Sequence, residues 1–232
     1  MNPLVCAICL TADRHQMTDR AVQCFLAQTY DNKHLLIYDT GKKPYRLDRL
    51  ASSCITLVCD GPEMAGTIGA LRNRANALAP PGTEILAHWD SDDWSNQYRL
   101  QDQVVCLNVY DKDCVGYGEM LFWDSRPTGR IVEILGEAWV YTGDSYHMIG
   151  TSLCYWRKTW EAKLFRETSA GEDHHFQEGI KRFAFPSLLS SGPVMIAEIH
   201  GKNTCAKIDP ANKKHWRRAI EYDKLAAEIM KL

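Results

Sequence analysis

A short apolar run ends at a cluster of carboxylates in the N-terminal half of this 232-residue chain. Residues 85–87 (Ile-Leu-Ala) are followed by Asp90, Asp92 and Asp93, and the polar residues 95–99 then lead into a helical pattern. The run predicts a buried strand that delivers the acids to one point, with a helix behind them. Because neighbouring carboxylates repel one another, such a cluster normally requires a cation, and hard oxygen ligands suit Mg²⁺ or Mn²⁺. The alternative is a helix N-cap together with two solvated acids, but a cap accounts for Asp93 and not for Asp90 and Asp92 together.

Composition narrows the class of protein. Hydrophobic residues make up 45% of the chain and charged residues 24%, which is typical of a globular domain. The net charge of -2 gives no general attraction to nucleic acid. No apolar run approaches the roughly 18 residues that span a bilayer, and the N-terminus lacks the basic segment of a signal peptide. With nine cysteines, mostly in apolar contexts, we expect reduced thiols in a cytoplasmic protein.

The first hundred residues alternate between strand and helix patterns. Strands are expected at 4–10, 34–38, 54–59 and 85–87, and helices at 17–29 (with Thr18 as its cap) and 68–79. This alternation predicts an α/β fold with a largely parallel sheet and helices on both faces. In such sheets ligands bind beyond the carboxyl ends of the strands. Three acids follow strand ends here and predict a ligand site at that edge: Asp13, Asp39 and Asp90.

The second half of the chain has less regular patterns. Strands are expected at 114–123, 130–141, 151–156 and 194–199, and helices at 97–109, around Trp160 and from Glu172 to about Phe183. We expect one domain over 1–208, with a nucleotide-binding half at about 1–100 and an acceptor-binding half at about 101–208. Residues 209–232 are expected to form a basic, amphipathic C-terminal helix. Its basic residues at 213–218 permit contact with a polyanion such as DNA, and a solvated helix face is the alternative.

The motifs, in their order along the chain, resemble those of family 2 glycosyltransferases, which have the GT-A fold. The resemblance covers about residues 4–205 and rests on Thr11-Ala12-Asp13-Arg14, Ala27-Gln28-Thr29-Tyr30, Tyr38-Asp39-Thr40-Gly41, Leu71-Arg72-Asn73-Arg74-Ala75, Asp90-Ser91-Asp92-Asp93 and Glu172-Asp173. The first of these resembles the family's nucleotide loop, the fifth its DxD metal motif, and the last its acid pair with the catalytic base. Three departures bear on nucleotide preference: Cys9-Leu10 for the usual Ile-Pro, Tyr38 for an acid, and Ala75 for Gly. The implied fold is a Rossmann-like, mostly parallel sheet flanked by helices, with a small antiparallel part in the C-terminal half.

The resemblance implies an enzyme, a hexosyltransferase or related glycosyltransferase. Such an enzyme would use Mn²⁺ or Mg²⁺ and transfer a sugar from a nucleotide-sugar donor, UDP-linked in our prediction, to an acceptor hydroxyl with inversion of the anomeric centre. The implied general base is Asp173, with Glu172 as its rival. The implied metal ligands are Asp92, Asp90 and His200. The nucleotide site would contain Thr11, Asp13, Arg14, Asp39, Arg72, Asn73 and Asp90, with Arg72 or Arg74 reaching the diphosphate.

Other side chains have less specific roles. Asp93 is expected to cap the following helix or to pair with Arg99. Four aromatic residues would offer faces for sugar stacking, although aromatic residues beside acids more often pack in a core: Trp89, Trp94, Trp139 and Tyr146. A glycan, a lipid-linked sugar, a protein and modified DNA all fit as acceptors. Two other functions also fit acids at strand ends, namely a non-catalytic nucleotide-sugar-binding relative and a nucleotidyltransferase.

Overall fold

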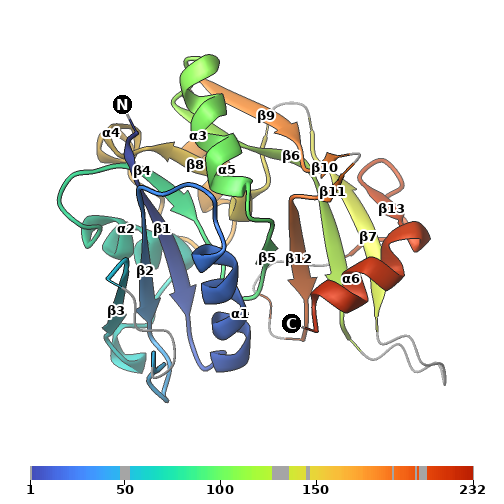
Figure 1. Cartoon of the computed structure of the whole chain (residues 1–232), viewed down its shortest axis with the longest axis horizontal. Coiled ribbons are helices and arrows are strands. Elements are labelled where there is room, and N and C mark those ends of the chain that lie inside the picture. Colours follow the sequence, from blue (N-terminus) through green and yellow to red (C-terminus); the bar gives the residue numbers. More distant parts are fainter. Residues whose placement is uncertain are drawn as a thin grey trace.

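The computed structural model describes residues 2–47, 53–126, 136–144, 147–189, 191–201, 203 and 208–231. These residues form a mixed sheet with the strand order β13-β7-β6-β8-β4-β1-β2-β3 and with helices on both faces (Figure 1). The strands are β1 Leu4–Thr11, β2 Lys33–Asp39, β3 Ile55–Cys59, β4 Thr83–His88, β5 Trp94–Ser95, β6 Cys114–Asp124, β7 Glu137–Thr142, β8 Cys154–Trp156, β9 Arg182–Pro186, β10 Leu188–Leu189, β11 Gly192–Pro193, β12 Met195–Ile199 and β13 Trp216–Arg218. The α-helices are α1 His15–Leu26, α2 Ile68–Ala77, α3 Arg99–Val109, α4 Arg157–Ala162, α5 Glu172–Gln177 and α6 Asp223–Ile229. The predicted fold class is confirmed.

Strand β1 is the centre of the N-terminal half. It pairs in parallel with β2 and β4, which places Thr11 opposite Asp39 and Ile8 opposite His88. Both faces of β1 are buried, because α1 and α3 pack on one face and α2, α4 and α5 pack on the other. The carboxyl ends of β1, β2 and β4 therefore meet at one edge of the sheet, where ligands of parallel sheets bind.

Strand β6 organises the C-terminal half. It runs antiparallel to β7 and β8 and parallel to β9 and β12. One face of β6 and β7 packs against α6 through Leu121, Val140 and Ala226. Strand β5, which follows the acidic cluster, pairs with β12. The chain on both sides of the acids is therefore held by sheet hydrogen bonds.

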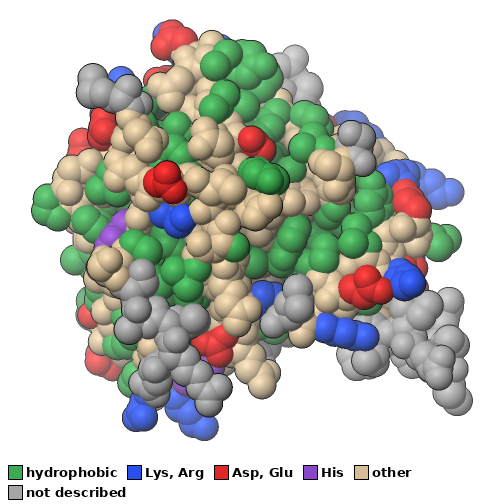
Figure 2. Space-filling view, in the orientation of Figure 1, with side chains coloured by type: hydrophobic (Ala, Val, Ile, Leu, Met, Phe, Trp, Pro, Cys, Tyr) green, Lys and Arg blue, Asp and Glu red, His purple; other side chains and the backbone are tan. Residues whose placement is uncertain are grey.

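Two helix predictions are wrong. Helix α5 ends at Gln177 rather than near Phe183, and after Gly179 (φ +73°) the chain forms β9 beside β6. The segment expected as one helix over 209–232 is interrupted, since β13 pairs with β7 and α6 is the one α-helix among its described residues 209–231. Pairing with distant strands overrides the local helical pattern at both places. Acidic and basic side chains are interspersed over α6 (Figure 2).

Smaller differences concern element ends. Thr18 does not cap α1: the N-cap is Arg14, and the Thr18 hydroxyl donates to the Arg14 carbonyl at 3.0 Å. Strand β8 begins at Cys154, after a 3-10 turn at Gly150–Ser152, rather than at residue 151. Residues 130–135 of the strand expected at 130–141 lie outside the described part of the chain. Among the described helices, none has the length and apolar character needed to cross a membrane.

Candidate active site

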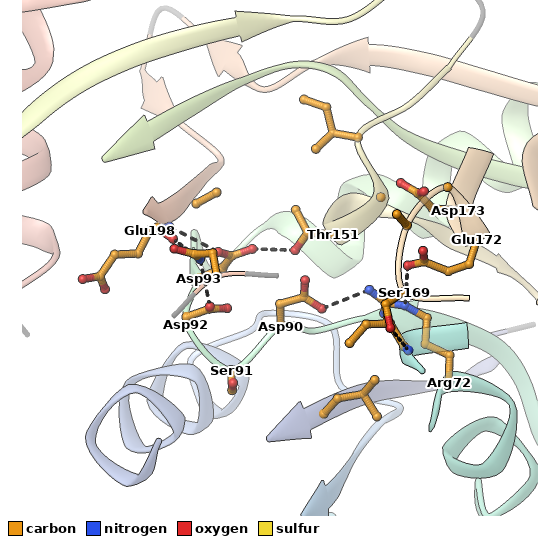
Figure 3. A pocket seen from close by; sticks show the side chains of 18 of the residues that line it. Arg72, Asp90, Ser91, Asp92, Asp93, Thr151, Ser169, Glu172, Asp173 and Glu198 are labelled. Atoms are coloured by element: carbon orange, nitrogen blue, oxygen red, sulfur yellow. Dashed lines mark hydrogen bonds and ion pairs between the residues drawn. The ribbon is translucent and has the colours of Figure 1, made fainter. Parts of the chain in front are cut away.

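A cavity of about 670 Å³ opens at the carboxyl ends of β1 and β4. Its floor carries the acidic cluster, and its opposite wall carries the start of α5 (Figure 3). In Figure 3, Asp92 and Asp93 lie on one side, Glu172 and Asp173 on the other, and Asp90 between them. The cavity thus brings together two acid pairs that are about 80 residues apart in the sequence.

Asp92 is the point where three segments converge. Its Oδ2 accepts hydrogen bonds from Arg14 Nη1 at 2.9 Å, from His200 Nε2 at 2.9 Å and from Asn203 Nδ2 at 3.3 Å. Burial of Asp92 disfavours its charged form, but the hydrogen bond from His200 and the charge of Arg14 outweigh burial and lower the pKa of the carboxyl. The Asp92 carboxyl is therefore held in its ionised form, with a histidine beside it.

The Asp92–His200 pair would fit a divalent cation once the His200 Nε2 atom gives up the proton of this hydrogen bond. Neighbouring ligands of an octahedral ion bound at about 2.1 Å are about 3 Å apart, which matches the separation of these two atoms. The described residues contain no cluster of three or more His, Cys, Asp or Glu side chains suited to a metal. Two protein ligands suffice for Mg²⁺ or Mn²⁺ when phosphate oxygens and water complete the shell. Asp90 is turned to the other side, where its Oδ1 lies 3.5 Å from Arg72 Nη2.

Asp93 has a different role from the two that were predicted. Its side chain is buried and accepts from the Thr151 hydroxyl at 2.5 Å and from the backbone N–H of Glu198 at 3.3 Å. Burial first, and then the charges of Asp92 and Asp90, raise its pKa well above the ordinary value. The cap prediction is wrong because Tyr98 is the N-cap of α3. Arg99 donates instead to Ser95, His88 and Thr151.

Only some of the predicted nucleotide residues line the cavity: Thr11, Arg14, Arg72 and Asp90. The Asp39 carboxylate accepts from the N–H groups of Gly41 and Tyr45, and the Asp13 carboxylate accepts from those of Lys42 and Lys43. Both acids thus shape the loop after β2, and Asp13 with His200 borders a second cavity of about 910 Å³.

Two further polar side chains on α2 face other segments. Asn73 is hydrogen-bonded to the backbone of Phe165 and to the indole of Trp160. Arg74 donates to the carbonyl of Met64 at 2.6 Å and is exposed. Of the residues in this motif, Arg72 is therefore the one whose guanidinium reaches the cavity.

Glu172 and Asp173 begin α5 immediately after Gly171, whose φ of +75° suits glycine. Glu172 is buried beside Arg72, with Oε1 at 3.9 Å from Nε. Burial raises the pKa of Glu172 despite this cation. Asp173 is half-buried, and its Oδ1 accepts from the N–H of His174 at 2.9 Å. Its Oδ2 lies against Gly150, where a Cβ would come within 2.1 Å.

Comparison with solved structures gives the fold a name, although no protein-family model and no curated protein sequence matches this chain. TarS 1-349 from S. aureus superposes with a TM-score of 0.62 at 17% identity over 84% of this chain and 60% of that one. The chain has a GT-A glycosyltransferase fold. TarS 1-349 in complex with UDP-GlcNAc gives 0.63 at 16% identity over 89% of this chain. The mannosyltransferase PcManGT from Pyrobaculum calidifontis, in complex with GDP-Man and Mn²⁺, gives 0.58 at 13% identity over 98% of this chain and 70% of that one. The chain spans about three fifths of the TarS fragments it matches.

Sequence reasoning missed His88, a buried residue of this GT-A fold behind the cavity. Its ring lies 2.6 Å from the Gly150 carbonyl, so Nδ1 carries the proton and donates, and Nε2 accepts from the Tyr155 hydroxyl at 3.3 Å. Burial and then the charge of Arg72 lower the pKa of His88 well below its usual value. A neutral histidine thus fixes the turn that contacts Asp173. The position of His88 at the end of an apolar strand does not indicate that its ring holds the Gly150 turn.

Of the two roles considered for the aromatic residues, core packing is confirmed for Trp89 and Trp94, and sugar stacking is not. Trp89 is buried, and its indole donates to the Ala21 carbonyl. Trp94 packs against the core. Trp139 does not line the cavity, and Tyr146 lies outside the described residues. Three other aromatic side chains line the cavity instead: Phe122, Tyr141 and Trp216.

Proposed function

We propose that the protein is a metal-dependent, inverting glycosyltransferase that moves a sugar from a nucleotide-activated donor to an acceptor hydroxyl. One observation carries this proposal: Asp92, whose carboxylate is hydrogen-bonded to His200, and the Glu172–Asp173 pair face one cavity from opposite sides (Figure 3). The fold supports the proposal, since the similar proteins were crystallised with UDP-GlcNAc and with GDP-Man and Mn²⁺. A UDP-linked sugar is the donor that we propose.

The donor side of the cavity would hold the diphosphate. Asp92 and His200 would hold Mn²⁺ or Mg²⁺ there, and Arg14 and Arg72 supply guanidinium groups that pair well with phosphate oxygens. The bound ion would stabilise the negative charge that builds on the diphosphate as the bond to the anomeric carbon breaks. Asp90, next to Arg72, is positioned to accept hydrogen bonds from sugar or ribose hydroxyls.

The acceptor side would hold the base. Asp173 is the better candidate because Glu172 is buried against Arg72, whereas Asp173 is half-exposed to the cavity. Its Oδ2 would take the proton of the acceptor hydroxyl while the hydroxyl oxygen forms the new bond to the anomeric carbon and the nucleoside diphosphate leaves. Inversion requires attack from the side opposite the leaving group, which agrees with Asp173 and Asp92 lying across the cavity from each other (Figure 3).

The test is release of nucleoside diphosphate. Purified protein with Mn²⁺ would be incubated with a panel of UDP-, GDP- and dTDP-sugars, with Asp92→Asn as the matched inactive variant. We expect one donor class to release its nucleoside diphosphate with the wild type and not with Asp92→Asn. Tight nucleotide binding without turnover would instead identify a non-catalytic relative, and release of pyrophosphate would identify a nucleotidyltransferase.

A further inference from the structure

The sheet formed by β6, β7 and β13 has two different faces. One face is covered by α6 through Leu121 and Val140. The other carries Phe122, Tyr141 and Trp216, which are half-buried and line the cavity. Trp216 lies directly across from Tyr141 in the β13–β7 ladder, and its ring centroid lies 4.9 Å from that of Tyr141 and 5.1 Å from that of Phe122. Three contiguous aromatic rings therefore face a space that the described chain does not fill.

This aromatic face belongs to the same cavity as the proposed base. The lining of this cavity also includes Asp144, His147 and His174. The rings of His147 and His174 stack at 4.6 Å. Burial, and then the charges of Asp144 and Asp173, raise the pKa of the Tyr141 phenol, so the ring lies within electrostatic reach of both carboxylates. A ligand on the rings would thus have polar groups and the base along one side.

We propose that Phe122, Tyr141 and Trp216 form the acceptor platform and that the acceptor is a sugar residue of a glycan. The inference rests on the proposed function and names the substrate class of its second site. A pyranose has an apolar C–H face that packs on aromatic rings and a rim of hydroxyls that needs hydrogen-bonding partners. An aromatic surface with a few polar groups at its edge provides both. Asp144 and His174 supply such polar groups here.

Charge favours a neutral glycan over a nucleic acid. Three cations around β13 are paired with carboxylates: Lys214 with Asp144 at 3.0 Å, Arg217 with Glu221 at 2.8 Å and Arg218 with Asp223 at 2.6 Å. A nucleic acid binds through cations that neutralise the charge of its phosphate groups. Here a phosphate group would have to displace a carboxylate from Lys214, Arg217 or Arg218 before that cation could bind it.

The experiment is saturation-transfer NMR on the full chain. The probes are methyl glycosides of glucose, galactose, mannose and N-acetylglucosamine, with their β-linked disaccharides. We expect the wild type to bind at least one of them and Trp216→Ala to weaken that binding about tenfold, since the change removes one stacking face. Trp216→Phe, which keeps a ring, should retain most of the affinity. Tyr98→Ala is the matched control, because Tyr98 is 51% exposed and does not line the cavity.

A second measurement separates this inference from the proposed function. Calorimetry would measure the binding of UDP and of GDP, in the presence of Mn²⁺, to the same variants. Unchanged nucleotide binding with lost saccharide binding in Trp216→Ala supports the platform. Two results would overturn the platform assignment, whatever the donor assay shows. One is that Trp216→Ala binds saccharides as tightly as the wild type does, and the other is that a short single-stranded oligonucleotide binds to the rings instead of a saccharide. Absence of any nucleotide-sugar binding would instead overturn the proposed function, and the saccharide titration would still report on the platform.

Discussion

Two adjacent carboxylates at the start of α5 occupy different surroundings. Glu172 is buried against Arg72, and burial raises its pKa. Asp173 lies at the cavity wall, held by the N–H of His174 and by contact with Gly150. In the proposed function, Glu172 therefore orients the Arg72 guanidinium, whereas Asp173 is the group that meets the acceptor hydroxyl.

Replacing Asp173 tests this division of roles. Asp173→Asn keeps the size of the side chain and its hydrogen bond from His174 but removes the proton acceptor. We expect the transfer rate to fall by about 10²–10⁴, the usual contribution of a general base, with nucleotide affinity unchanged. Initial rates and nucleotide calorimetry would measure the two quantities. Glu172→Gln is the neighbouring control and should weaken nucleotide binding more than it slows transfer, and the reverse ranking would contradict the assignment.

His88 makes stability depend on pH. In the fold its pKa is depressed by burial, whereas in the unfolded chain it binds a proton near pH 6.5. The unfolded state therefore holds more protons below that pH, so the stability that His88 contributes is complete above about pH 6.5 and is lost as the pH falls, by up to about 1.4 kcal/mol for each pH unit.

Urea unfolding of the wild type and His88→Gln at pH 7.5 and 5.5 would measure the loss. The wild type should lose more free energy of unfolding between the two pH values than His88→Gln does. His15→Gln serves as the control, because His15 is exposed and its replacement should leave the wild-type difference intact. Equal differences in the wild type and His88→Gln would show that His88 does not carry this dependence.

At the scale of elements, α2 and the segment before α5 meet at a glycine. A Cβ on Gly69 would lie 1.8 Å from the carbonyl oxygen of Arg166 and 3.3 Å from Cβ of Glu172. The Gly69 N–H also donates to the Thr168 carbonyl at 3.0 Å. The close approach therefore sets how near the start of α5, with both acids, comes to α2.

Gly69→Ala should move these two elements apart. We expect a loss of about 1–3 kcal/mol in the free energy of unfolding, as for other overpacked contacts, together with slower transfer because Glu172 and Asp173 shift. Gly66→Ala is a matched control on the same approach to α2, since its Cβ would meet nothing closer than Arg74 Nη1 at 4.0 Å. Similar stability and activity of the two variants would show that the contact does not position α5.

The elements also show what the sequence can predict. Periodicity located β1, α1, β2, α2 and β4 because each has a local apolar pattern and turns at both ends. It failed at β9 and β13, whose conformation depends on pairing with β6 and β7. The same distinction applies to the site. The motif resemblance selected Asp92 and His200, which the fold brings together, but also Asn73, whose amide is used by the backbone of Phe165.

At the scale of the whole molecule, one buried arginine joins segments from both halves. Arg20 Nη2 donates to the Asp92 carbonyl at 2.7 Å and to Glu198 Oε2 at 2.5 Å, and its Nη1 donates to the Met230 carbonyl at 2.9 Å. It thus ties α1 to the acidic loop, to β12 and to the end of α6. No local pattern could reveal this role, because its partners lie 72, 178 and 210 residues away.

Removing Arg20 should therefore affect stability and the donor site together. Arg20→Ala leaves the Glu198 carboxylate buried without its cation, which typically costs about 3–5 kcal/mol, and it frees the loop that holds Asp92. Urea unfolding and nucleotide calorimetry would measure the two effects. The double variant Arg20→Met with Glu198→Gln removes both charges, so we expect it to recover much of the free energy of unfolding. Its nucleotide binding should stay weaker than that of the wild type, because the hydrogen bond to the Asp92 carbonyl is still lost. If the single and double variants are equally unstable, Arg20 and Glu198 do not act as a pair, and the joint between the halves lies elsewhere.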